Sequence, residues 1–258
     1  MEESPSIIYE KSEGVARITL NRPQVRNALD LEMRDQLWTA MAAVRDDPDV
    51  AVAVIRGAGD AFSAGADISE FGTAPSYVQA RRARRERDLW QRMVDLDKLL
   101  IVAIHGYALG AGCEMSMFCD LRIAADDARL GLPEVTLGYI PSAGGTQMLP
   151  RTLAYGVAME MLLTGDAIDA ATALRLGLVH RVVPRDRLDA EAMAWAHKLA
   201  SLPQAALRYA KEAVTRGLEM PLVEGLDLER RLASLLLASP EASQAISRYR
   251  AAQAVAYR

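Results

Sequence analysis

The sequence is poor in the residues that build disulfide frameworks and metal centres. Its 258 residues include only two cysteines and three histidines. Cys113 and Cys119 fit a reduced interior better than a disulfide framework, and their spacing is not typical of a metal site. The histidines (His105, His180 and His197) are scattered along the chain. We therefore expect no metal site and no structural disulfide.

Long apolar runs and a strong net charge are lacking as well. No stretch reaches the length of about 20 apolar residues that a membrane-spanning helix needs, and no N-terminal apolar segment is typical of a signal peptide. The formal net charge of −4 gives no whole-chain argument for nucleic acid or an anionic membrane as a partner. We expect a cytoplasmic protein without a membrane partner.

The composition that remains is typical of a globular protein, with 51% hydrophobic and 25% charged residues. The length suits one large domain, or one domain with a small appendage. We find no internal repeat and no low-complexity linker. The pattern predicts a core domain over residues 1–195 and a helical C-terminal region over residues 196–258.

Strands and helices alternate in the first part of the chain. Residues 7–20 read as two short strands, and Asp30 is typical of a helix N-cap before an apolar pattern with helical spacing. The β-branched run over residues 50–55 is typical of a strand buried on both faces. Residues 81–100 read as one helix with a basic start, RRARRER. Strand–helix–strand order favours an α/β fold.

The second half is predicted to be mainly helical. Residues 146–163 read as one helix, and Asp169 is expected to cap a shorter one that ends at Gly177. From Leu188 onward the pattern is helical, with breaks at Pro203, Pro221 and Pro240.

The chemistry is concentrated in residues 101–150. An apolar run ends in a turn of small residues, 106–112, and Glu114 follows where a helix is expected to begin. A strand that stops at glycines and restarts as a helix leaves N–H groups unpaired, and they can stabilise developing negative charge. A second carboxylate, Glu134, follows Pro133. The alternative is a plain strand–turn–helix joint with Glu114 as an ordinary first-turn acid.

A second turn of small residues ends in the sequence Gly65-Ala66-Asp67-Ile68. Taken alone, it can be an ordinary strand-to-helix turn with Asp67 near the N-cap. Together with other motifs, however, the sequence resembles the crotonase family, the enoyl-CoA hydratase/isomerase superfamily. The resemblance runs in order over nearly the whole chain, through residues 21–23, 27–29, 61–68, 106–114, Asp120, 132–134, Gly138, 140–147, 163–165 and 177–179.

The resemblance implies an α/β fold: a crotonase-like spiral of β-β-α units with a helical C-terminal region. It also implies a homo-oligomer, either a trimer or a dimer of trimers. The substrate would be an acyl-CoA thioester. Coenzyme A would be carried as part of that substrate, so no separate cofactor is expected.

The resemblance also implies roles for individual residues. Ala66 and Ala111 correspond to the backbone donors to the thioester oxygen, although the family usually has glycine at position 111. Glu114 and Glu134 match the two catalytic glutamates of the hydratases. Contacts with the substrate are implied for a larger set, namely Arg26, Ala64, Gly65, Asp67, Ile68, Tyr107, Leu109, Gly110, Pro133, Tyr139 and Ser142.

The favoured activity is therefore that of an enoyl-CoA hydratase, which reversibly adds water to a 2-enoyl-CoA and gives a 3-hydroxyacyl-CoA. Two alternatives stay open. A Δ3-Δ2 enoyl-CoA isomerase would need Glu134 alone. A non-catalytic family member could bind RNA through the basic run at residues 81–87, although no aromatic platform is interleaved with it.

Several positions depart from the family or have more than one interpretation. Ser142 stands where the hydratases commonly have glycine, and Ile246 and Tyr249 replace the usual aromatic and lysine that help to hold coenzyme A. Tyr139 either lines the acyl pocket or simply packs. Cys113 is interpreted as a small packed residue, because no histidine adjoins it in sequence.

Overall fold

The computed structural model describes residues 4–70, Ser76 and 86–256, the last six of these by their backbone alone. The chain divides into two compact units, Met1–His197 and Lys198–Arg258, which are described separately. The basic run predicted at residues 81–87 lies largely outside the described residues; only its last two positions are included.

The larger unit contains a six-stranded sheet that is parallel except for its first strand. The strand order is β1-β2-β3-β4-β6-β9, and only β1 and β2 pair antiparallel. All residues of β4 are buried, as a strand covered on both faces requires. The strands are β1 (Ile7–Ser12), β2 (Val15–Leu20), β3 (Val52–Gly57), β4 (Leu99–Ile104), β6 (Leu121–Ala125) and β9 (Arg181–Val183).

A second, three-stranded sheet has the order β5-β7-β8. It consists of β5 (Tyr107–Leu109), β7 (Arg129–Gly131) and β8 (Ile168–Asp169). The chain passes from β4 in the first sheet to β5 in the second, and then from β6 to β7 in the same way. Helices or 3₁₀ turns follow each pair, which gives the β-β-α succession that was predicted.

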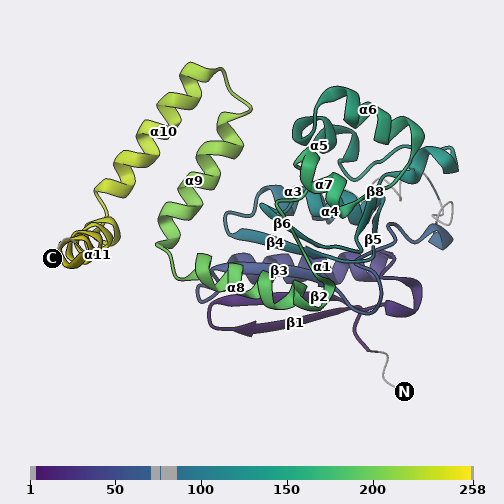
Figure 1. Ribbon diagram of the computed structural model, residues 1–258, viewed down its shortest axis with the longest axis horizontal. Helices are drawn as coiled ribbons and strands as arrows, with labels where there is room; N and C mark the ends of the chain where they lie inside the picture. Colours follow the sequence, from purple (N-terminus) through teal and green to yellow (C-terminus); the bar gives the residue numbers. More distant parts are fainter. Residues whose placement is uncertain (1–3, 71–75, 77–85, 257–258) are drawn as a thin grey trace. The chain divides into compact units, whose positions relative to one another are not determined.

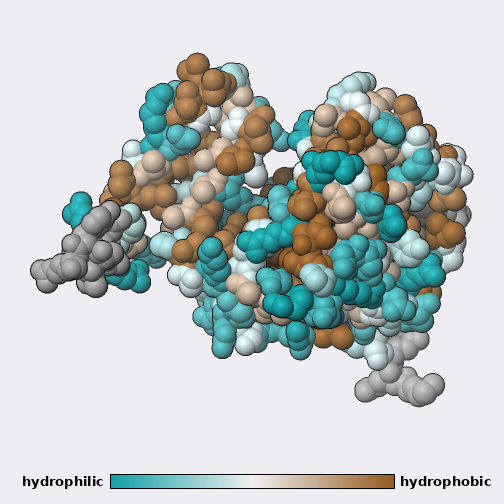
Figure 2. All heavy atoms as spheres, viewed as in Figure 1, coloured by the Kyte–Doolittle hydropathy of each residue, from teal (hydrophilic) through white to brown (hydrophobic). Residues whose placement is uncertain are grey.

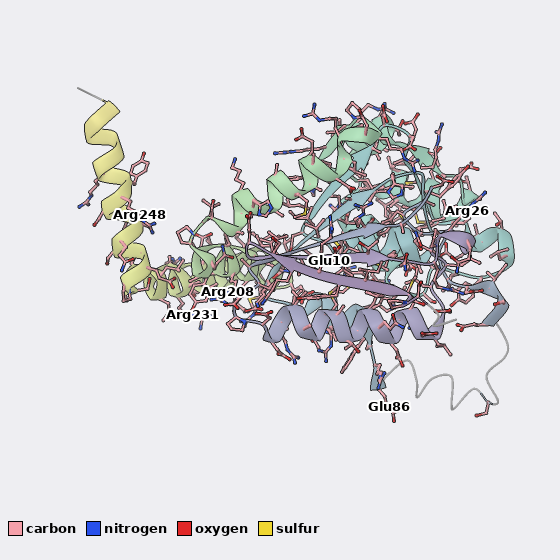
Figure 3. The ribbon with its side chains drawn as sticks, turned by 90° about the horizontal axis from the view of Figure 1, so that it is seen from below. Glu10, Arg26, Glu86, Arg208, Arg231 and Arg248 are labelled. Atoms are coloured by element: carbon pink, nitrogen blue, oxygen red, sulfur yellow. The ribbon has the colours of Figure 1, made fainter. Side chains whose placement is uncertain are left out.

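Helix α1 (Leu31–Asp46) covers one face of the large sheet (Figure 3). Asp30 caps it as expected, because its Oδ1 accepts a hydrogen bond from the Met33 amide at 2.8 Å. Four further helices of this unit lie close together (Figure 1). They are α4 (Ala111–Met117), α5 (Gly145–Thr152), α6 (Tyr155–Thr164) and α7 (Ala170–Leu176).

Two of the predicted helices have different bounds. The apolar spacing over residues 89–100 was wrongly extended, because the helix α3 (Leu89–Val94) is short and Leu100 belongs to β4. The predicted single helix over residues 146–163 is two helices, α5 and α6. The chain breaks there because Leu153 adopts an extended conformation, with φ −114° and ψ 161°.

Short 3₁₀ segments complete this unit: η1 (Pro23–Val25), η2 (Ile68–Glu70), η3 (Pro133–Leu137) and η4 (Arg185–Arg187). Helix α8 (Leu188–Ala200) ends just beyond the boundary between the two units.

The smaller unit is helical, with α9 (Gln204–Gly217), α10 (Leu222–Leu237) and α11 (Pro240–Ala256). Prolines precede α9 and α10 and open α11, so the predicted breaks are confirmed. Leu228 and Leu232 of α10 are buried. In the described part of the chain, no helix combines the length and the apolar character needed to cross a membrane.

Candidate active site

The two turns of small residues lie side by side, although more than forty positions separate them in sequence. The Ser63 amide donates to the Tyr107 carbonyl at 2.9 Å, and the Leu109 amide donates to the Ser63 carbonyl at 3.0 Å. Gly65 has φ +101°, and a Cβ at this position would lie 2.8 Å from the Leu109 carbonyl oxygen. Glycine is therefore required for the two turns to approach so closely.

Ala66 and Ala111 come from these two turns. Ala111 is the first residue of α4, and a Cβ built on Gly65 would lie 3.5 Å from its amide nitrogen. Within the part of the chain that the structure describes, neither the Ala66 nor the Ala111 amide donates a hydrogen bond to another residue. The positive φ is taken by Gly110, so alanine at position 111 causes no backbone strain.

Glu114 lies in the first turns of α4 and is almost completely buried, with 2% of its surface exposed. Its Oε1 accepts hydrogen bonds from the amides of Ala143 at 2.9 Å and Gly145 at 2.7 Å. Burial raises the pKa of Glu114 to about 7; the nearby Glu134 also raises it, whereas the two amide donors lower it. This carboxyl can therefore change its protonation state near neutral pH.

Glu134 follows Pro133 in η3 and is also buried, with 9% exposed. A Cβ on Gly110 would lie 2.8 Å from Glu134 Oε1, so the carboxylate faces the turn that leads into α4. Among the described residues, its Oε2 has no hydrogen-bond partner. Burial raises the pKa of this carboxyl as well. A buried carboxyl with an unpartnered oxygen is typical of a group that meets a ligand.

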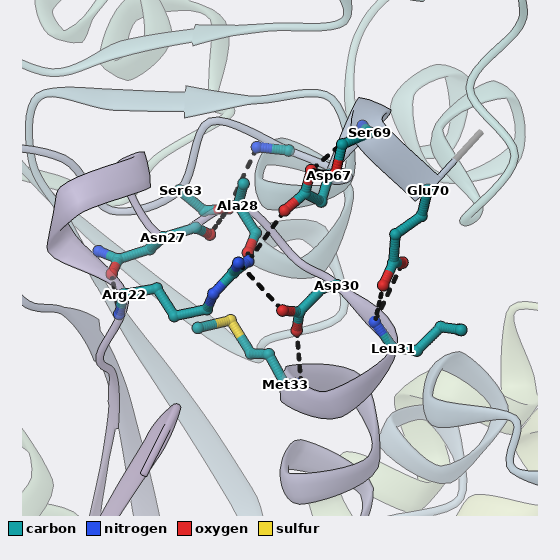
Figure 4. Close-up of polar contacts among 11 residues, drawn as sticks. Arg22, Asn27, Ala28, Asp30, Leu31, Met33, Ser63, Asp67, Ser69 and Glu70 are labelled. Carbon is teal, nitrogen blue, oxygen red and sulfur yellow. Dashed lines mark hydrogen bonds and ion pairs between the residues drawn. The ribbon is translucent and has the colours of Figure 1, made fainter. Parts of the chain in front are cut away.

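A polar network supports the loop that contains Ala66 (Figure 4). Arg22 donates from Nη1 to the Ala28 carbonyl at 2.7 Å and to Asp67 Oδ2 at 3.1 Å, while its Nη2 pairs with Asp30 Oδ2 at 3.1 Å. Asp67 directly follows Ala66. The network therefore ties the loop to the N-terminus of α1, which Asp30 caps.

Backbone contacts strengthen the same connection. The Leu29 amide donates to the Gly65 carbonyl at 2.8 Å, and the Asp67 amide donates to the Leu29 carbonyl at 3.0 Å. The Ser63 hydroxyl donates to the Asn27 carbonyl at 2.8 Å and accepts from the Gly65 amide at 3.2 Å. Ala66 is thus held from both neighbours by the segment at residues 27–30.

The remaining predicted contact residues occupy different surroundings. The guanidinium of Arg26 lies 5.6 Å from the ring centroid of Tyr107, and both side chains are exposed. Ala64 and Ile68 are exposed too, whereas Leu109 and Pro133 are half-buried. The carboxylate of Asp67 is already engaged by Arg22 and by the Ser69 hydroxyl, the latter at 2.7 Å.

Two other reactive side chains have structural surroundings. Burial raises the pKa of the Cys113 thiol to about 12, so it stays protonated and packs as expected. His105 is buried, with Nε2 3.1 Å from the Gly59 carbonyl oxygen, and burial lowers its pKa. Among the described residues, no three acidic, histidine or cysteine side chains converge as a metal ion would require.

Sequence reasoning did not assign several residues that support this site. The amides of Ala143 and Gly145 were not singled out, because a backbone donor leaves no side-chain signal. In the sequence, Arg22 and Asn27 stand out only as parts of family motifs. Both side chains can form several hydrogen bonds, and this property could have indicated that they hold the neighbouring loop in place.

Comparisons with known proteins show which family the chain belongs to. A family model described as enoyl-CoA hydratase/isomerase matches residues 10–256. A probable enoyl-CoA hydratase of Mycobacterium bovis is 42% identical over 244 residues, covering 95% of this chain and 94% of its own length. The crotonyl-CoA hydratase of Syntrophomonas wolfei is 38% identical over 246 residues, covering 95% of this chain and 94% of its own length.

A solved structure gives the same result for the fold. The crystal structure of an enoyl-CoA hydratase subunit from Geobacillus kaustophilus superposes with a TM-score of 0.90 at 38% identity, covering 95% of this chain and 94% of that one. The predicted α/β crotonase fold is thereby confirmed. The chain belongs to the enoyl-CoA hydratase/isomerase family, the crotonase superfamily, and is an enzyme of the hydratase type.

Proposed function

We propose that this enzyme reversibly adds water to a 2-enoyl-CoA and gives a 3-hydroxyacyl-CoA. The observation that carries the proposal is the meeting of two buried carboxyls, Glu114 and Glu134, beside a turn with unpaired backbone amides. Hydration needs a base for the water and an acid for the α carbon. Glu114 and Glu134 could supply this base and this acid.

The amides of Ala66 and Ala111 would receive the thioester oxygen. When the water oxygen bonds to the β carbon, the electrons of the double bond move toward the carbonyl and charge develops on that oxygen. Two N–H groups without other acceptors can stabilise this enolate, and loss of one such donor typically costs about 3 kcal/mol of transition-state stabilisation.

Hydrogen bonding divides the two acid–base roles. Glu114 accepts two amide hydrogen bonds, which favour its ionised form, so we assign it the proton of the attacking water. Glu134 Oε2 accepts no hydrogen bond from the described residues, and its carboxyl faces the turn that leads into α4, so it is placed to meet a bound substrate. We assign Glu134 the proton that is delivered to the α carbon. The reverse reaction uses the same groups with their roles exchanged.

The isomerase alternative uses only Glu134, because one carboxyl can move a proton between the α and γ carbons. An isomerase mechanism would give Glu114 no role in the reaction, although Glu114 is buried and held by two amide hydrogen bonds. The hydratase is therefore favoured.

The RNA-binding alternative depends mainly on residues outside the described ones. Of its basic run, Arg87 pairs with Asp35 at 2.7 Å and its guanidinium lies 5.6 Å from the ring centroid of Trp38. An RNA mobility shift at physiological salt tests it directly, because non-specific binding weakens steeply with salt.

A substrate comparison tests the proposed function. Purified enzyme is given crotonyl-CoA or a 3-enoyl-CoA, and the conjugated double bond is followed by its ultraviolet absorbance. We expect loss of absorbance with crotonyl-CoA, without added metal or cofactor. Faster gain of absorbance with the 3-enoyl-CoA would identify an isomerase instead.

A further inference from the structure

A pair of hydroxyl groups lies in the segment that runs from Glu134 to the backbone amides that contact Glu114. The hydroxyls of Tyr139 and Ser142 form a hydrogen bond with each other. The Tyr139 amide donates to the Glu134 carbonyl at 3.1 Å, so one end of the segment is anchored at Glu134. At the other end, Ser142 directly precedes Ala143, whose amide donates to Glu114.

We propose that Tyr139 and Ser142 are positioning residues for Glu114. Their hydroxyl–hydroxyl bond, named here the 139–142 clasp, would hold the segment so that the amides of Ala143 and Gly145 stay on Glu114 Oε1. The inference rests on the proposed function in one respect, namely that Glu114 acts on the attacking water.

Two backbone amides of this segment are not engaged in hydrogen bonds with the described residues. Within the described part of the chain, the amides of Ile140 and Ser142 donate no hydrogen bond, and both side chains are exposed. Gly144 has φ +110°, and a Cβ on Gly145 would lie 2.9 Å from Glu114 Oε1. The backbone must therefore approach the carboxylate closely through a conformation that glycine permits. The hydrogen bond between the two hydroxyls lies directly before this turn and would restrict the conformations of its backbone.

The clasp has an electrostatic consequence for Glu114. The amide hydrogen bonds from positions 143 and 145 stabilise the ionised carboxylate, whereas burial and the charge of Glu134 oppose ionisation. No other charged side chain among the described residues contributes to this balance. If the clasp is lost and the amides move away, the pKa of Glu114 rises further above about 7.

Serine at position 142 is a departure from the glycine that is common in the family, and glycine cannot form this bond. The clasp therefore belongs to this chain rather than to the family as a whole. It links a residue at the edge of the site to the protonation state of a buried carboxyl.

A set of conservative variants tests the clasp: Tyr139→Phe, Ser142→Ala, the double variant, and Ser142→Thr, which keeps the hydroxyl. Tyr155→Phe, at an exposed tyrosine on α6, is the matched control. We expect each single variant to lower kcat for crotonyl-CoA about fivefold at pH 7, the loss typical of one neutral hydrogen bond. KM should change little, and Ser142→Thr should restore the rate.

The pH dependence separates positioning from a general effect on folding. The acidic limb of kcat should move to higher pH in both single variants, because ionised Glu114 is the active form. In protein with ¹³C-labelled glutamate carboxyls, the Glu114 resonance should titrate at a correspondingly higher pH. The double variant should be no worse than either single variant, since all three lack the same bond.

Two results would overturn the clasp: an unchanged Glu114 titration in folded Tyr139→Phe and Ser142→Ala proteins, or rate losses that multiply in the double variant. Thermal melting confirms that the variants are folded. If the unmodified enzyme does not hydrate crotonyl-CoA, the proposed function fails. The carboxyl titration still decides on the clasp in that case, because it needs no substrate.

Discussion

The carboxyl oxygens of Glu114 and Glu134 are held in different ways, and this difference matters most at the scale of single residues. Two backbone amides fix one oxygen of Glu114, whereas an oxygen of Glu134 is buried without a partner among the described residues. One carboxyl is thus oriented by the protein, and the other is left to interact with whatever enters the site.

We predict that Glu114→Gln and Glu134→Gln each lower the rate of hydration about 100-fold or more, the loss expected when acid–base help is removed. The double variant should fall by much less than the product of the single losses, because groups that act as a unit are not additive. Initial rates with crotonyl-CoA measure this. Glu160→Gln, on the exposed face of α6, is the control.

Exchange of the α proton with solvent distinguishes the two roles. Glu134→Gln should abolish exchange in a bound saturated acyl-CoA, and Glu114→Gln should keep it. If Glu114→Gln leaves hydration intact while only Glu134→Gln abolishes activity, a single-acid isomerase becomes the better account.

The raised pKa of Glu114 predicts a pH-dependent stability. Below the ordinary value of 4.5 the carboxyl is protonated in the folded and the unfolded state, and above about 7 it is ionised in both. Between these limits the folded state binds more protons, so its stability falls as pH rises. Glu114→Gln removes this dependence, and the variant should gain up to about 3 kcal/mol relative to the unmodified protein between pH 4.5 and pH 8.

Urea unfolding of both proteins at pH 4.5 and pH 8 measures this difference in the free energy of unfolding. Glu134 titrates in both proteins, so its effect largely cancels in the comparison. A constant difference between the two proteins over this pH range would contradict the raised pKa of Glu114.

The sequence indicates Glu114 and Glu134 as candidate catalytic residues, but it does not indicate their hydrogen-bond partners. Glu114 and Glu134 stand beside glycine or proline turns, which is a local signal. The contact between Glu114 and the amide of Gly145 joins residues 31 positions apart. Such a contact depends on how α4 and α5 pack, which no local spacing contains.

At the scale of elements, the approach of two turns determines the candidate site. The loop ending at Gly65 and the turn entering α4 are joined by backbone hydrogen bonds, and Arg22 ties that loop to the start of α1. The distance between Ala66 and Ala111 therefore depends on three elements at once.

We predict that Gly65→Ala disrupts this approach, because its φ of +101° and the 2.8 Å contact with the Leu109 carbonyl both exclude a side chain. Hydration of crotonyl-CoA and the melting temperature should both fall. Gly156→Ala is the matched control. It lies in helix α6 with nothing within 4 Å of the added Cβ, and should stabilise the protein by up to about 1 kcal/mol. Equal behaviour of the two variants would argue against a close approach at Gly65.

Sequence patterns predicted helix boundaries best where a capping residue or a proline marks them. Asp30 and Asp169 cap helices through their own side chains, and prolines mark the starts of α9, α10 and α11. The predictions failed where a helix pattern continued across a boundary, as at Leu100 and Leu153. There, tertiary packing decided between two structures that the apolar spacing allowed equally.

At the scale of the whole molecule, the helical unit has more apolar surface than three helices can cover. Figure 2 shows brown, apolar spheres around the connection between α9 and α10. The exposed residues there include Val214, Leu218, Leu222 and Val223, each at least 61% exposed. We propose that a second copy of the chain covers this surface, as the family resemblance implied.

The corresponding prediction concerns assembly. Light scattering at micromolar concentration should give the mass of a trimer or a larger multiple. Leu218→Glu combined with Leu222→Glu should lower this mass, because charged residues oppose burial of the surface. A stable monomer in the unmodified protein would rule out the assembly, whatever the activity.

The two proposed donor amides have a consequence for how this enzyme can be studied and how its sequence can change. Both belong to alanines, at positions 66 and 111, so an alanine scan would pass over them without a signal. The proposed charge-stabilising groups are main-chain atoms, which side-chain substitution can displace but cannot delete. Replacing either amide with an ester by chemical protein synthesis would remove one donor and leave the side chain in place. Natural sequence drift can likewise alter the side chains around these donors without erasing them.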